Sequence, residues 1–147
     1  MTAYYSPKPD QTLYLRGSYE ADIRLNGNGT NGASGKEVFA GMIAAPKTYA
    51  FGTRIELSGI GIGIVEDRGG AIVVAGERGY DADRIDIWMG EGEEGLIRAL
   101  TFGKRTVYGR VLSESSAVST IDLTSFPSDR KAVIASLSRQ SSKIPDA

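Results

Sequence analysis

The sequence predicts a small, mainly β domain whose strands close into a barrel. Strand-like segments, each short and rich in β-branched or aromatic residues, dominate the first 112 residues and are bounded by Gly, Pro or Asn. The chain has 19 glycines among its 147 residues, a high content that indicates many turns. One helix is expected within this region, directly before the last strand. Short strands with a single helix in this place favour a small closed β-barrel.

The expected strands follow one another closely along the chain. The Ser58-Gly59 pair in "IELSGIGIGIV" predicts a hairpin turn between two of them. A glycine-rich loop, "LNGNGTNGASG", separates the second strand from the third over residues 25–35. In chain order, the expected strands are residues 2–5, 20–25, 41–46, 53–57, 60–66, 84–88 and 106–112.

The expected helix covers residues 90–104, "GEGEEGLIRALTFGK". Acidic residues occupy its first turn, where the helix dipole favours them. Leu96, Ile97 and Leu100 fall on one face. Gly103 and Lys104 then end the helix in the usual way.

The composition of the chain changes after residue 112. Residues 1–112 form the expected barrel domain, whereas residues 113–147 contain ten serines and few large apolar groups. The stretch "SESSAVST" is typical of a linker. Within the C-terminal tail that follows, "PSDRKAVIASL" at residues 127–137 favours a short helix capped at Ser128.

The absence of histidine and cysteine excludes several kinds of catalytic site. Nucleophile pairs of the Ser–His and Cys–His kinds cannot form, and neither can zinc sites built from these residues. Carboxylate, Lys and Tyr side chains remain for proton transfer. The aspartates of "YDADRIDIW" lack the glycine and the distal glutamate of a calcium loop. We therefore expect no metal and no cofactor.

Charge and hydropathy limit the partners. The net charge is −1 and no basic patch stands out, which argues against a nucleic-acid partner. No apolar run reaches the length of about 18 residues that a spanning helix needs, so a membrane would be reached only through a parent chain. The N-terminal "MTAYYSPKPD" lacks the basic and apolar regions of a signal peptide. Either the protein is not exported by that route, or this is a domain of a longer exported chain.

Two aspartates sit at the edges of strand-like runs. Asp67 ends "IGIVED", and a structural role would be to accept N–H bonds from Gly69 and Gly70 in a tight turn that needs a positive φ at Gly69. Asp86 lies in "RIDIW", where alternation places it on the same face as Trp88. It is either a surface residue or an acid in a cleft, whose pKa apolar neighbours and nearby carboxylates would raise.

Beyond these single features, an ordered series of motifs resembles one family. The series "AAPKTYAFGT", "GIGIVEDRGGAI", "RIDIW", a helix with an acidic start and "GKRTV" resembles the three-aspartate domain of lytic transglycosylases and of muralytic resuscitation or stationary-phase proteins, which is related to the rare lipoprotein A domain. The resemblance covers roughly residues 2–112 and implies a six-stranded double-psi β-barrel with one or two short helices.

The family likeness also implies an activity and a location. The expected reaction is cleavage of the peptidoglycan glycan strand between N-acetylmuramic acid and N-acetylglucosamine, leaving 1,6-anhydro ends. Asp86 matches the catalytic aspartate and Asp67 the second aspartate, which would help to keep Asp86 protonated. The place of action would be the cell wall or another site outside the cytoplasm, in a bacterial enzyme or a phage lysin. The domain is expected to be a monomer.

The sequence departs from the family pattern at two places. Ala45 stands where the first family aspartate is usual. A third carboxylate then comes from Glu20, Glu66 or Asp83, or the domain only binds cell-wall glycan without cleaving it. The interval between the two aspartates is also long, so the inserted residues would form either a flap over the groove or a longer surface turn.

Several further residues are candidates for sugar binding. Tyr4, Tyr5 and Tyr80 could stack on sugar faces, although most aromatic side chains of a small barrel pack in its core or rim. Ser34 could bind an N-acetyl group, or else make only local bonds in its glycine-rich loop. The substrate-binding residues expected are Ser34, Tyr49, Gly69, Gly70 and Trp88.

Overall fold

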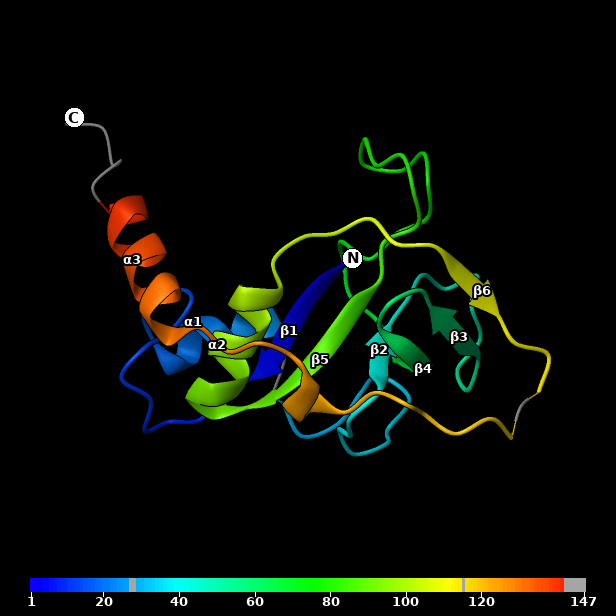
Figure 1. Ribbon diagram of the computed structural model, residues 1–147, viewed down its shortest axis with the longest axis horizontal. Coiled ribbons are helices and arrows are strands. Elements are labelled where there is room, and N and C mark those ends of the chain that lie inside the picture. The colour runs from blue at the N-terminus through cyan, green and yellow to red at the C-terminus, as the bar shows by residue number, and fades with distance from the viewer. Residues whose placement is uncertain (27–28, 115, 142–147) are drawn as a thin grey trace.

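The computed structural model describes residues 1–26, 29–114 and 116–141. Its centre is a mixed sheet of six strands, with helices gathered at one end of the sheet, around β1 (Figure 1). The strands are β1 (Thr2–Ser6), β2 (Met42–Ala44), β3 (Arg54–Leu57), β4 (Gly61–Asp67), β5 (Asp86–Glu91) and β6 (Gly109–Val111). The helices are α1 (Tyr19–Asn26), α2 (Gly92–Phe102), the 3-10 turn η1 (Leu123–Ser125) and α3 (Arg130–Ser141).

The sheet is open, so the expectation of a closed barrel is not confirmed. The strand order is β1-β5-β2-β4-β3-β6, and the described strands include no pairing of β1 with β6 that would close it. β1 pairs in parallel with β5, and β2 with β4, while the remaining pairs are antiparallel. One edge strand, β1, packs against α1 and α2, and the other, β6, is a short, exposed strand of three residues.

Six of the seven expected strands are present, but residues 20–25 are not a strand. They belong to helix α1. Ser18 caps this helix, because its Oγ accepts a bond of 3.1 Å from the backbone N–H of Ala21. Asp22 anchors the helix from inside: it is fully buried and accepts bonds from the Tyr5 hydroxyl and from the N–H of Leu15, at 2.8 Å.

The helix expected before the last strand is confirmed as α2. Leu96 and Ile97 are buried, and the helix packs on β1 and β5. The contact is close: a Cβ placed on Gly95 would lie 2.5 Å from the backbone carbonyl of Gly90, so only glycine fits there. The largest buried side chains of the sheet and of α2 are Tyr5, Met42, Ile43, Val65, Ile87, Met89 and Leu96.

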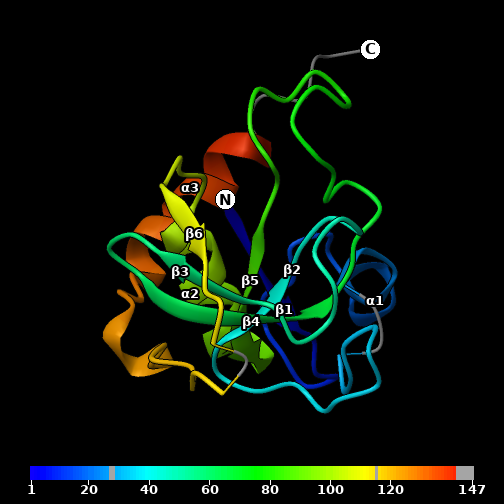
Figure 2. The same cartoon turned by 90° about the vertical axis from the view of Figure 1, so that its right-hand side faces the viewer.

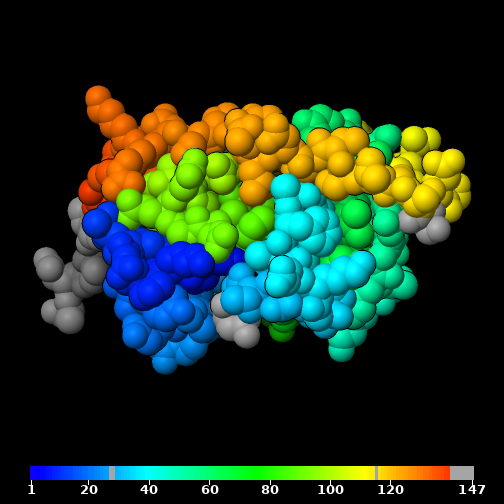
Figure 3. Space-filling model, turned by 90° about the horizontal axis from the view of Figure 1, so that it is seen from below, coloured from blue at the N-terminus to red at the C-terminus, as the bar shows by residue number. Residues whose placement is uncertain are grey.

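The described residues after Leu112, 113–114 and 116–141, lie along the sheet and α2, although part of this segment was expected to form a linker. In Figure 3 they form a band from β6 to α3. The N–H of Ile62 donates to Thr120 Oγ1 at 2.8 Å, and Ile121 is buried. The expected helix is confirmed as α3, with its capping bond from Asp129, whose carboxylate accepts the N–H of Ala132, rather than from Ser128. The domain boundary at residue 112 stays a prediction.

The long connection between β4 and β5 projects beyond the sheet (Figure 2, green). Backbone bonds tie it together, among them the N–H of Arg84 to the carbonyl of Val73 at 2.9 Å. The carboxylate of Asp83 adds a bond from the N–H of Ala75 at 2.8 Å. The insertion is therefore a loop tied together by its own hydrogen bonds, and its expected role as a flap or as a surface turn stays a prediction.

Candidate functional site

The central strand β2 brings Asp67 and Asp86 together. Ala44 of β2 pairs with Asp86 of β5 on one side and with Asp67 of β4 on the other. Neighbouring strands lie about 4.8 Å apart, so the two aspartate backbones are separated by roughly 10 Å. Both residues line one hollow of about 440 Å³, together with Ala44 and Tyr4. The structure thus places the two aspartates of the sequence prediction in the same concave site.

A shift in the strand register sets the position of Asp67. Ile43 pairs with Val65 and the next residue, Ala44, pairs with Asp67, so Glu66 is an extra residue in β4. Such a bulge interrupts the alternation of side chains, and here Val65 and Glu66 are both buried. The carboxylate of Glu66 forms an ion pair with Lys36 at 3.2 Å.

Asp86 is a mostly buried acid with one direct hydroxyl partner. Thr2, its neighbour on the parallel strand β1, donates from Oγ1 to Asp86 Oδ1 at 3.0 Å. The guanidinium of Arg84 in turn donates to Thr2 Oγ1 at 3.2 Å. Burial raises the pKa of Asp86 to about 6, and the charge of Asp67 adds to this, while Thr2 and Arg84 oppose it. The acid therefore keeps its proton up to about pH 6, well above the range of an ordinary aspartate.

Asp67 accepts hydrogen bonds from three donors, none of which was predicted. Its Oδ1 accepts from the N–H groups of Ala33 at 3.0 Å and Arg68 at 2.8 Å. Its Oδ2 accepts from the hydroxyl of Tyr4 at 2.7 Å. Tyr4 stands on the edge strand β1 and reaches across the hollow. Burial and the charge of Asp67 raise the pKa of the Tyr4 phenol well above its ordinary value, so the hydroxyl stays a donor.

The expected role of Gly69 and Gly70 as donors to Asp67 is wrong. The recorded bonds of Asp67 come from the three groups above, and neither glycine has a positive φ. Arg68 holds this turn instead, because its guanidinium donates to the carbonyl of Ala45 at 3.2 Å and to that of Tyr49 at 2.8 Å. Gly69 still lines the hollow of the two aspartates.

Trp88 does not contribute to this hollow. It is 6% exposed, and its Nε1–H donates to the hydroxyl of Ser6, which is itself buried, at 2.9 Å. The expected substrate-binding role is therefore corrected to a core position, because alternation gives the face of a strand but not what covers that face. Tyr5, 1% exposed, is a core residue as well.

Ser34 and Tyr49 are not among the residues that line the hollow. Ser34 Oγ accepts the N–H of Lys36 at 3.3 Å, a local bond within the glycine-rich loop. The side chain of Tyr49 lines a second, larger hollow, where its hydroxyl donates to Asp83. Neither residue is brought to Asp86.

The candidates for a third carboxylate are also placed elsewhere. Ala45 is completely buried, so an aspartate at this position would lie in the core. Glu20 is exposed on α1, Glu66 is buried in its ion pair, and Asp83 lines the second hollow. The lining of the first hollow includes Asp67 and Asp86 as its acidic side chains.

Within residues 1–26, 29–114 and 116–141, no group of three or more Asp, Glu, His or Cys side chains is placed to hold a metal ion. None of the described helices combines the length and apolar character needed to cross a bilayer.

Comparisons with known protein families, with curated proteins and with solved structures found no match to this chain.

Proposed function

We propose that the domain cleaves the glycan strand of peptidoglycan between N-acetylmuramic acid and N-acetylglucosamine, as a lytic transglycosylase. The observation that carries this proposal is the pairing of Asp67 and Asp86 on either side of Ala44, in one hollow, with the pKa of Asp86 raised to about 6. An acid of this kind suits general acid catalysis, because a catalytic pKa near the working pH is the most effective.

Asp86 acts twice in the proposed reaction. As an acid, it donates its proton to the glycosidic oxygen while the bond from that oxygen to C1 of the muramyl residue breaks. As a base, the resulting carboxylate takes the proton of the muramyl C6 hydroxyl while O6 bonds to C1. The nucleophile is tethered to the sugar that reacts, so one acid/base group is sufficient. The products are a 1,6-anhydro end and a free hydroxyl on the leaving sugar.

Asp67 has a supporting role in this proposal. Its position is fixed by Tyr4, Ala33 and Arg68, and its charge contributes to the raised pKa of Asp86. The same charge stabilises the positive charge that develops on the sugar ring as the glycosidic bond breaks.

We relate the sheet to the double-psi barrel of the three-aspartate family. Its six strands, with parallel pairs β1–β5 and β2–β4 between segments distant in the chain, support this relation. The open edge between β1 and β6 then makes it a divergent member. The substrate places the proposed site of action outside the cytoplasm, and one copy of the chain supplies both aspartates, so a monomer is sufficient.

One observation favours a second candidate, a module that binds cell-wall glycan without cleaving it. The position of the first family aspartate is Ala45, which is buried, and none of Glu20, Glu66 and Asp83 replaces it in the hollow. The two candidates predict different products from the same substrate.

Digestion of purified sacculi tests the proposal. Soluble fragments from wild type, Asp86→Asn and Asp81→Asn are analysed by mass spectrometry, where Asp81 is an exposed aspartate outside the hollow and is the matched control. We expect 1,6-anhydro-muropeptides from wild type and Asp81→Asn, and none from Asp86→Asn. Binding of all three proteins to sacculi without release of fragments would favour the binding module. Fragments with ordinary reducing ends alone would contradict the lytic mechanism.

A further inference from the structure

A second hollow lies on the opposite side of the start of β5. Its volume is about 620 Å³, within the range of roughly 300–1,000 Å³ that is usual for small-molecule sites. Ile85 lines this hollow, whereas the next residue, Asp86, lines the hollow of the two aspartates. The two hollows share no described lining residue, so they are separate sites.

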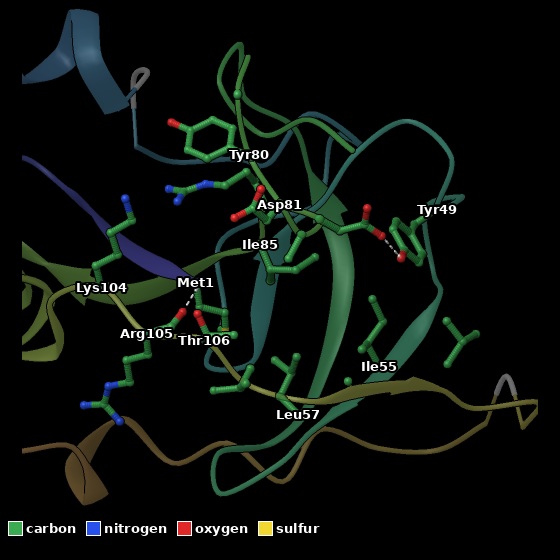
Figure 4. Close-up of a pocket in the computed structure, with 17 residues that line it drawn as sticks. Met1, Tyr49, Ile55, Leu57, Tyr80, Asp81, Ile85, Lys104, Arg105 and Thr106 are labelled. Atoms are coloured by element: carbon green, nitrogen blue, oxygen red, sulfur yellow. Dashed lines mark hydrogen bonds between the residues drawn. The ribbon is translucent and has the colours of Figure 1, made fainter. Parts of the chain in front are cut away.

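The floor of the second hollow is apolar. Ile55 and Leu57 of β3 and Ile85 contribute side chains that belong to the core, with exposures of 4%, 3% and 7%. Figure 4 shows these three side chains below Tyr80 and Asp81. Contact with this floor favours a ligand with an apolar body, because burying apolar surface is favourable.

Two cations meet on one side of this floor. The guanidinium carbon of Arg84 lies 4.5 Å from the ring centre of Tyr80, and the ammonium of Lys104 lies 5.9 Å from it. Among the described residues, no carboxylate lies within ion-pair distance of either cation. In addition, Nε of Arg84 is buried and has no described hydrogen-bond partner. Two positive charges therefore lie close to the Tyr80 ring, and the Nε–H of Arg84 has no acceptor. This arrangement favours an anion between Arg84 and Lys104.

The other charged side chains of the hollow neither bind the anion at this position nor form an ion pair with Arg84 or Lys104. The carboxylate of Asp83 already accepts bonds from Tyr49 and Ala75. Asp81 is exposed at the mouth. The side chain of Arg105 turns away (Figure 4) and stacks on Phe102, 4.0 Å from the ring centre. The anionic group of a ligand is therefore expected on the side of Arg84 and Lys104.

We propose that the second hollow binds a small organic anion. Its carboxylate or phosphate lies between Arg84 and Lys104, and its apolar body lies on Ile55, Leu57 and Ile85. This is a binding activity separate from glycan cleavage, although Arg84 also donates to Thr2, the hydrogen-bond partner of Asp86.

Methyl NMR of the full chain, labelled at Ile, Leu and Val, tests this inference. The protein is titrated with 2-naphthoate, 2-naphthyl phosphate and the uncharged 2-naphthamide. We expect saturable shifts of the Ile55, Leu57 and Ile85 methyl signals, with at least one anion bound about tenfold more tightly than the amide, as one added charge-assisted hydrogen bond would give. The tighter of the two anions shows whether the site prefers a carboxylate or a phosphate.

Two exposed lysines provide a matched pair of variants. Lys104→Gln is expected to weaken binding of the preferred anion by about threefold or more, because it removes one of the two cations. Lys47→Gln, on the turn after β2, is expected to leave it unchanged. The inference is overturned by equal affinity for the amide, by unchanged affinity in Lys104→Gln, or by shifts confined to Ile72, which lines the first hollow. None of these measurements uses glycan, so a negative result would overturn the anion site without contradicting the proposed cleavage activity.

Discussion

Replacement of Asp86 by Asn should stabilise the protein at neutral pH. The amide has the size of the carboxyl group, and its oxygen can still accept the bond from Thr2. It cannot ionise, so the folded variant no longer holds a buried negative charge. A gain in stability at a proposed catalytic residue is expected where function requires a group that the fold disfavours.

The size and the pH dependence of the effect follow from the raised pKa. Folding raises the pKa of Asp86 from 3.8 to about 6. Between these values the folded protein keeps a proton that the unfolded chain has lost. The contribution of Asp86 to stability is therefore fully present below about pH 4 and is lost as the pH rises through about 6. Each tenfold change in proton affinity corresponds to about 1.4 kcal/mol, so the ionised group costs up to about 3 kcal/mol above pH 7.

Urea unfolding at two pH values measures this cost. Trp88 is the only tryptophan and is buried, so its fluorescence reports the loss of structure. Asp86→Asn should exceed wild type by up to about 3 kcal/mol at pH 7.5 and equal it at pH 4. Asp81 is exposed in the loop, so Asp81→Asn should have the same free energy of unfolding as wild type at both pH values. A variant less stable than wild type at pH 7.5, or a difference independent of pH, would refute the reasoning.

Three further substitutions test the site and the packing around it. Gly95→Ala should destabilise the protein by roughly 1–3 kcal/mol in urea unfolding, because the new methyl group meets the backbone of a strand. Gly70→Ala is the control: its methyl group has free space around it and should leave the free energy of unfolding nearly unchanged. Arg84→Gln should raise the pKa of Asp86 in an NMR titration, since the positive charge of Arg84 lowers it; an unchanged pKa would contradict this. Tyr4→Phe removes a hydroxyl bonded to a carboxylate and should cost about 1.5–3 kcal/mol of the free energy of unfolding at pH 7; an unchanged midpoint would show that water replaces the bond.

The strands were predictable from the sequence because their signals are local. Turn residues bound each run, and "IELSGIGIGIV" forms the expected antiparallel pair of β3 and β4. Residues 20–25 were predicted wrongly because their alternation of apolar and charged residues also suits a helix. The decisive signal there was Ser18, a capping residue three positions before Ala21. Closure of the sheet could not be judged, since it depends on pairing between β1 and β6, which are far apart in the sequence.

The site was predictable in part, for a related reason. Asp67 and Asp86 stood out in the sequence because each is a carboxylate at the end of an apolar, strand-like run. The partners of Asp67 were not predictable, because Tyr4 and Ala33 come from distant segments that only the sheet register brings together. The register shift at Glu66 leaves no local signal in the sequence.

An NMR titration of the Asp86 carboxyl carbon in the wild-type protein tests the central claim most directly. The signal is assigned by its loss in Asp86→Asn, and the titration is repeated in Asp67→Asn. We predict a midpoint at about pH 6 in wild type, and a lower midpoint in Asp67→Asn that still lies above the ordinary value for an aspartate, because burial contributes more than the charge of Asp67. A wild-type midpoint near pH 4, the value of an aspartate in water, would contradict the account.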